Sequence, residues 1–159
     1  MSYAKMRAFF DAQGLGDRLV EHDEVGDTVE HAAQVLGCKP EQIAKTMSFQ
    51  LSTGPIVVAM AGDAKVNSSK FKATFHEKAV MVPWDQVGEV IGHEPGAVTP
   101  FALNEGVKVY LDISMKRFAD MYAAGGSLNS TVHLTMPEIE QLTGFTDWVD
   151  ICKGWQIEV

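Results

Sequence analysis

Lys45 is the first residue whose type and position suggest chemistry, because it opens a segment of alternating polar and apolar residues that leads into the predicted core. A lysine at the rim of a cavity can bind a carboxylate, carbonyl or phosphate oxygen. A lysine at the edge of a strand can equally extend its ammonium group into solvent. Residue type and position leave both interpretations open.

Three glycine-containing segments further along the chain are candidates for the rest of a site. In Gly96-Ala-Val-Thr-Pro100, glycine permits close approach to a ligand, and exposed main-chain N–H groups can hold an oxyanion or orient a water molecule. Gly125-Gly-Ser-Leu-Asn-Ser-Thr131 offers small polar donors, and Gly62-Asp63 offers a carboxylate. Each segment can also be a simple connector or turn.

The sequence lacks the motifs of several large enzyme classes. It contains no G-x-S-x-G, no phosphate-binding G-x-x-x-x-G-K-[ST] and no G-x-G-x-x-G. The five histidines show no metal-ligand spacing, and the two cysteines, Cys38 and Cys152, form no C-x-x-C motif. We therefore expect reduced cysteines, no metal site and no cofactor.

Composition and charge indicate a globular chain with one domain, residues 1–159. Hydrophobic residues make up 46% of it, and no apolar run reaches the roughly 20 residues that span a bilayer. The N-terminus has no signal-peptide pattern, so we expect a cytoplasmic location and no membrane partner. The net charge of −8 predicts weak nonspecific binding to nucleic acid and no DNA partner, although 65–78 is locally basic.

The residue pattern predicts about seven strands with short helices between them, which favours a mixed α/β fold with a barrel-like sheet. An alternating segment at 45–51 precedes an apolar run at 55–61, and the turn between them predicts a hairpin. Further strands are expected at 18–22, 79–82, 107–113, 121–124, 131–135 and 148–152. Helices are expected from Ser2 towards Gly14, from a cap at Asp27 or Thr28 to Leu36, and at 67–75, 84–91 and 137–142.

Taken in order, these segments resemble the YbaK/EbsC family, which includes the editing domain associated with prolyl-tRNA synthetase and its free-standing relatives. The resemblance extends over residues 20–152. It rests on Asp27-Thr-Val-Glu-His-Ala-Ala-Gln-Val-Leu-Gly37, Gln42-Ile-Ala-Lys45-Thr46, the apolar strand ending in Gly62-Asp63, Gly96-x-x-x-Pro100 and Gly125-Gly-Ser-x-Asn-Ser-Thr131. It implies a compact α/β domain built around a mixed, barrel-like sheet.

The resemblance also implies an activity: trans-acting hydrolysis of the ester between a mischarged amino acid and tRNA, of the tRNA(Pro) type. Lys45 matches the lysine that the family needs, and Gly96 and Ala97 stand in the loop whose amides are thought to grip substrate or water. The implied partners are the 3′ end of aminoacyl-tRNA and prolyl-tRNA synthetase or another synthetase. The residues expected to line or support the pocket are Thr46, Asp63, Val98, Thr99, Pro100, Gly126, Ser127, Asn129 and Ser130.

The implied chemistry agrees with the absence of a strong nucleophile, because an activated ester needs mainly positioning and charge stabilisation. The amino acid stays open, since Ala124-Gly-Gly-Ser-Leu-Asn129 differs from the Ser-Gly-Gly-Lys-Arg-Gly stretch of the branch acting on cysteinyl-tRNA(Pro). Two other functions stay open as well. One is a non-catalytic adaptor that binds aminoacyl-tRNA or a synthetase, and the other is a small-molecule ester or amino-acid binder.

Overall fold

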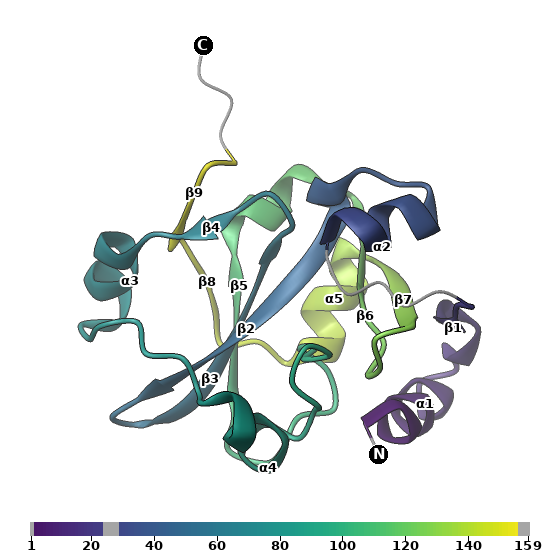
Figure 1. The fold of residues 1–159 in the computed structure, drawn as a ribbon, viewed down its shortest axis with the longest axis horizontal. Coiled ribbons are helices and arrows are strands. Elements are labelled where there is room, and N and C mark those ends of the chain that lie inside the picture. Colours follow the sequence, from purple (N-terminus) through teal and green to yellow (C-terminus); the bar gives the residue numbers. More distant parts are fainter. Residues whose placement is uncertain (1, 24–28, 156–159) are drawn as a thin grey trace.

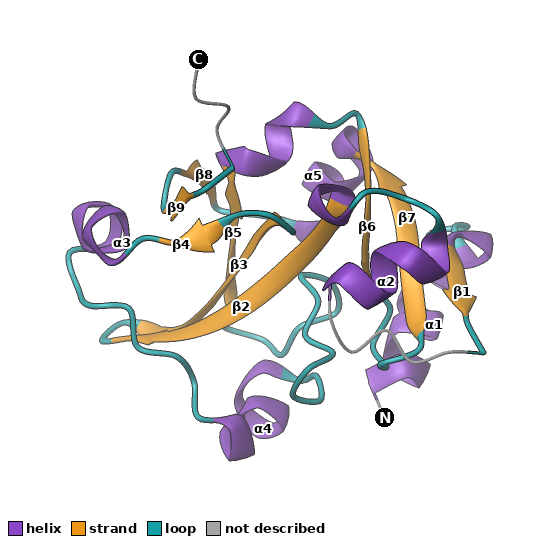
Figure 2. Cartoon of the chain, turned by 45° about the horizontal axis from the view of Figure 1, so that its top comes forward, coloured by secondary structure: helices purple, strands orange, loops and turns teal. Residues whose placement is uncertain are grey.

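A seven-stranded mixed sheet forms the centre of the molecule (Figures 1 and 2). The computed structural model describes residues 2–23 and 29–155. The strand order is β1-β7-β6-β2-β3-β5-β8, and β4 and β9 form a separate pair. The strands are β1 Leu19–Glu21, β2 Ile43–Leu51, β3 Gly54–Ala61, β4 Lys65–Val66, β5 Lys108–Asp112, β6 Asp120–Ala124, β7 Ser130–Thr135, β8 Asp147–Val149 and β9 Cys152–Lys153.

In the described residues, five short α-helices surround the sheet, so the predicted mixed α/β architecture is confirmed. They are α1 Ser2–Ala12, α2 Val29–Leu36, α3 Ser68–Phe75, α4 Val87–Ile91 and α5 Met136–Thr143. Asn67 caps α3 by accepting the N–H of Lys70 at 3.0 Å, and a capping box of Thr135 and Glu138 begins α5. The predicted caps of α2, Asp27 and Thr28, lie outside the described residues. No helix in the described ranges is long and apolar enough to cross a membrane.

The predicted hairpin of β2 and β3 is confirmed, and it separates two hydrophobic clusters. The register places Lys45 opposite Met60 and Thr46 opposite Ala59. Ala59 belongs to the larger cluster, whereas Met60 belongs to the smaller one. The segment from Ile56 to Ala61 is buried throughout, because β3 is covered on both faces. Successive residues of β2 therefore point towards different halves of the molecule.

Two of the predicted strands are wrong in detail. The segment 79–82 contributes only an isolated bridge between Met81 and Phe49 of β2. Pro83 fixes the backbone directly after this segment, where the chain turns away from β2. The predicted strand 148–152 is divided between β8, which pairs with β5, and β9, which pairs with β4. The buried carboxylate of Asp112 accepts the N–H of Ile151 at 2.9 Å and holds the chain where it changes sheets.

Candidate functional site

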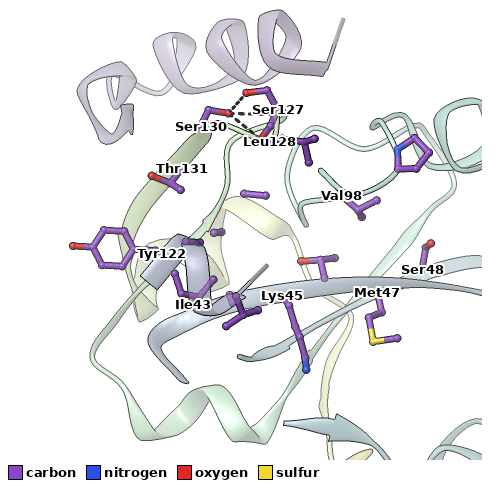
Figure 3. Close-up of a pocket in the computed structure, with 18 of the residues that line it drawn as sticks. Ile43, Lys45, Met47, Ser48, Val98, Tyr122, Ser127, Leu128, Ser130 and Thr131 are labelled. Atoms are coloured by element: carbon purple, nitrogen blue, oxygen red, sulfur yellow. Dashed lines mark hydrogen bonds between the residues drawn. The ribbon is translucent and has the colours of Figure 1, made fainter. Parts of the chain in front are cut away.

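A cavity of about 510 Å³ lies beside β2, and Figure 3 shows part of its lining. Its walls come from α2, β2, the segment after residue 80, the loop around Gly96 and the hairpin of β6 and β7. Residues from both faces of β2 take part, from Ile43 to Ser48. The cavity therefore extends around the edge of this strand, and its walls come from segments that lie far apart in the sequence.

The edge of β2 is free at the centre of the cavity. Ile43 and Ala44 pair with β6, and the carbonyl of Ser48 accepts the N–H of Val82 at 3.1 Å. Within the described ranges, no strand pairs with β2 between these two contacts on this side. Because main-chain groups alternate along a strand, those of Thr46 face the same edge as those of Ser48. Thr46 thus presents a main-chain donor and acceptor beside the cavity.

Lys45 lines the cavity, but its ammonium group does not face the glycine loops. Figure 3 shows Lys45 and Ser48 on opposite faces of β2, with Val98 on the side of Ser48. Burial lowers the pKa of the half-buried Lys45, and the positive charge of Lys65 lowers it further, whereas Asp63 opposes this shift. The side chain can still hold an anionic or carbonyl group that reaches around the free edge.

The loop of residues 92–101 (the 92–101 loop) places Gly96 and Val98 on the cavity. Gly96 has φ of +85°, a conformation that favours glycine. Ala97 is buried and donates its N–H to the carbonyl of Glu94 at 3.0 Å, so this predicted donor is used inside the loop. The N–H groups of Gly96 and Val98 have no hydrogen-bond partner among the described residues. These two amides and that of Thr46 are the main-chain candidates for donating hydrogen bonds to a ligand.

The other two predicted residues of this loop, Thr99 and Pro100, are buried beneath it and do not face the cavity. The buried His93 ring forms a hydrogen bond of 2.7 Å with the carbonyl of Phe101, which ties the two ends of the loop together. Burial lowers the pKa of His93, which favours the neutral ring.

The turn of residues 124–131 (the 124–131 turn) forms the opposite wall through Ser127, Asn129 and Ser130. The Oγ of Ser130 accepts the N–H of Ser127 at 3.1 Å and lies 2.6 Å from its hydroxyl oxygen (Figure 3). Asn129 donates its side-chain amide to the carbonyl of His22 at 3.0 Å. Gly126 is buried with φ of +98° and shapes the turn without lining the cavity.

Asp63, which the sequence placed in or near the pocket, does not line the cavity. Its carboxylate accepts two hydrogen bonds from Arg117, at 2.5 and 3.0 Å. The guanidinium group of Arg117 also lies over the Trp155 ring. Asp63 thus holds the end of β3 to a distant part of the chain and reaches Lys45 only through its charge.

Sequence reasoning missed several apolar residues of the cavity. Val35 on α2 and Tyr122 on β6 line it, and so do Met81, Trp84 and Leu128, which are exposed. The inward stripe predicted for α2 was a usable signal for that wall. An exposed side chain carries no periodic signal, so Trp84 could not be found in this way. The described residues contain no group of three or more His, Cys, Asp or Glu side chains placed to hold a metal ion.

Comparison with known proteins gives a consistent set of similarities. The family model of the aminoacyl-tRNA editing domain matches residues 23–142. An uncharacterized protein of Bacillus subtilis, YwhH, is 37% identical over 157 residues, which cover 98% of this chain and all of that protein. The proline–tRNA ligase of Bacillus licheniformis is 29% identical over 67% of this chain, but that match spans only 18% of the ligase.

A solved structure gives the same indication at the level of the fold. It is described as a proposed trans-editing enzyme for prolyl tRNA synthetase and is 25% identical to this chain. The two superpose with a TM-score of 0.87 over 96% of this chain and 98% of the other. The similarity therefore extends over nearly the whole of the fold.

Proposed function

The chain belongs to the aminoacyl-tRNA editing domain family, and on this premise we propose that it is a trans-acting deacylase that hydrolyses the ester of mischarged tRNA. The observation that carries the proposal is the cavity of about 510 Å³ at the free edge of β2, bounded by Lys45, Thr46 and Gly96. The similarity to proline–tRNA ligases supports tRNA(Pro) as the class of tRNA.

In the proposed reaction, water attacks the ester carbonyl, and the bond between that carbon and the ribose oxygen breaks. The ribose oxygen takes up a proton as it leaves, and the amino acid departs with a free carboxylate. The N–H groups of Thr46, Gly96 and Val98 stabilise the oxyanion of the tetrahedral intermediate, because fixed donors act strongly in a partly dry site. Lys45 attracts the negative or carbonyl oxygens of the substrate from the other side of the strand edge.

The proposed selectivity follows from size and polarity. Val35, Val98 and Leu128 line the cavity with apolar groups, which suits an uncharged amino-acid side chain. A synthetase pocket discriminates a single methylene group by only about 1–3 kcal/mol, so a second site of different size is useful. We propose that the substrate carries a small uncharged amino acid, which the walls of the cavity select by volume.

The experiment is a deacylation assay with a panel of mischarged tRNAs that varies both the amino acid and the tRNA. The variants are Lys45→Ala and, as a matched control, Lys72→Ala, an exposed lysine on α3. We expect turnover of at least one substrate, a loss of about 10²-fold in Lys45→Ala and no change in the control. Absence of turnover for every substrate would overturn the proposed deacylase activity. Binding of tRNA without turnover would indicate a non-catalytic adaptor.

The pH dependence tests the charge of Lys45. If the protonated ammonium group acts on the substrate, activity corrected for spontaneous ester hydrolysis falls as pH rises through the lowered pKa of Lys45. Arginine keeps its charge over this range, so Lys45→Arg should retain activity at alkaline pH relative to its own neutral value. Identical alkaline limbs in the two proteins would assign that limb to another group.

A further inference from the structure

The mouth of the cavity carries an unusual concentration of exposed apolar side chains. Five large hydrophobic residues of the described chain are exposed: Val20, Val80, Met81, Trp84 and Leu128. Three of them, Met81, Trp84 and Leu128, line this one cavity. Trp84 is the most exposed of the five, at 72% of its surface. Exposed apolar side chains that gather at a cavity mark a contact surface, whereas scattered ones need no explanation.

The Trp84 indole lies beside Gly96 and Leu128. A Cβ atom placed on Gly96 would stand 3.6 Å from Cη2 of Trp84 and 3.4 Å from Cδ2 of Leu128. The indole edge therefore lies beside the bare backbone of Gly96, with the Leu128 side chain next to it. Pro83, with φ of −55°, immediately precedes Trp84 and restricts the backbone that carries the ring. The result is a positioned aromatic surface at the entrance to the proposed site.

We propose that Trp84 stacks against the terminal nucleobase of the aminoacyl-tRNA substrate and so positions the ester in the cavity. This inference rests on the proposed function, because an aminoacyl ester inside the cavity leaves the attached terminal nucleoside at its mouth. Stacking on aromatic side chains is the usual way in which proteins hold unpaired bases. It also suits a chain of net charge −8, which attracts phosphate groups only weakly.

Kinetics on two kinds of substrate give the first test. We expect Trp84→Ala to raise KM for mischarged tRNA by about tenfold, Trp84→Phe to restore most of the binding, and neither to change turnover of an aminoacyl methyl ester without a nucleoside. Val20→Ala, which removes an exposed apolar group away from the cavity, is the matched control. An equal loss on both substrates would overturn stacking and indicate a structural role for Trp84.

Fluorescence gives a second test that does not need turnover. The chain has three tryptophans, and neither Trp148 nor Trp155 lines the cavity. In the Trp148→Phe, Trp155→Phe protein, an uncharged RNA hairpin ending in CCA should quench Trp84, and the same hairpin with an abasic 3′ nucleotide should not. Quenching without deacylation would support stacking on Trp84 and would contradict the proposed deacylase activity. Equal quenching by both hairpins, or no quenching, would overturn the proposal. A dimer that forms in the native protein and is lost in Trp84→Ala would also overturn it, because a second copy of the chain would then cover this surface.

Discussion

The two walls of the cavity that come from loops are built in different ways. The 92–101 loop is anchored by its own buried side chains, among them His93, Thr99 and Phe101, which pack into the interior. The 124–131 turn is held instead by hydrogen bonds among its own polar groups and by the bond from Asn129 to the carbonyl of His22. One wall depends on packing against the core, and the other depends on local polar contacts.

This difference has consequences for how each wall responds to change. A loop anchored by packing loses stability when a buried group is removed, because the core cannot fully close the space. A turn held by hydrogen bonds is sensitive to the loss of a single partner, because the remaining donor is left unpaired. In the proposed reaction, the 92–101 loop supplies hydrogen-bond donors and the 124–131 turn supplies shape. Substitutions in the two walls should therefore lower activity for different reasons.

The largest expected effect is on the packed wall. Phe101 is 1% exposed, and its ring centroid lies 5.4 Å from that of Phe10. Phe101→Ala should lower the free energy of unfolding by about 3–5 kcal/mol, because it leaves a cavity in the larger cluster. Leu128→Ala on the other wall should cost much less, since its side chain is 45% exposed. Denaturant unfolding measures both, and equal losses would contradict the comparison.

The next effect is on the polar wall. Ser130→Ala removes the acceptor of the Ser127 N–H and the partner of the Ser127 hydroxyl. We expect a loss of about 1–3 kcal/mol in the free energy of unfolding, because both groups of Ser127 lose a buried hydrogen-bond partner. Ser130→Thr, which keeps a hydroxyl group, serves as the control. Unfolding of Ser130→Ala at the same denaturant concentration as the native protein would show that these hydrogen bonds do not stabilise the turn.

A smaller effect of opposite sign is expected within the packed wall. The Oγ1 of Thr99 is buried and has no hydrogen-bond partner among the described residues. Thr99→Val replaces this hydroxyl with a methyl group and should raise the free energy of unfolding by about 1 kcal/mol. Deacylation should not change, because Thr99 does not line the cavity. A destabilised or inactive variant would show that the hydroxyl has a partner or a role.

The smallest expected effect concerns pH. Burial keeps the pKa of His93 below its ordinary value, so the unfolded chain binds a proton before the folded chain does. Stability should therefore fall as pH drops below about 6.5, the ordinary pKa of histidine. His93→Gln keeps a donor for the Phe101 carbonyl without titrating, so its unfolding should depend less on pH between 7 and 5.5. Parallel curves for the two proteins would remove His93 from the pH response.

The fold was largely predictable because most elements carry local signals. The apolar run from Ile56 to Ala61 specifies a strand buried on both faces, and the glycines at 37 and 92 end their helices with positive φ. The segments 79–82 and 148–152 were predicted less well. Their apolar content matches a strand, but Pro83 and the Asp112 carboxylate decide where pairing stops.

The candidate site was predictable only as a set of segments. Lys45, Thr46, Gly96, Val98, Ser127, Asn129 and Ser130 do line one cavity, and the motifs that contain them stand in the sequence. Which atoms of those motifs are available was not predictable. The Ala97 amide is used by Glu94, and the Asp63 carboxylate is used by Arg117, 54 residues away.

The elements, their glycine-bearing turns and the family resemblance follow from the amino-acid sequence alone, because these features depend on neighbouring residues. The free edge of β2 at Thr46, and the position of the Lys45 side chain on the face away from Val98, depend on the packed fold. The position of Trp84 beside Gly96 and Leu128 depends on it as well. These facts depend on contacts between distant segments, and strand alternation turns each residue to one face or the other only after those segments have packed.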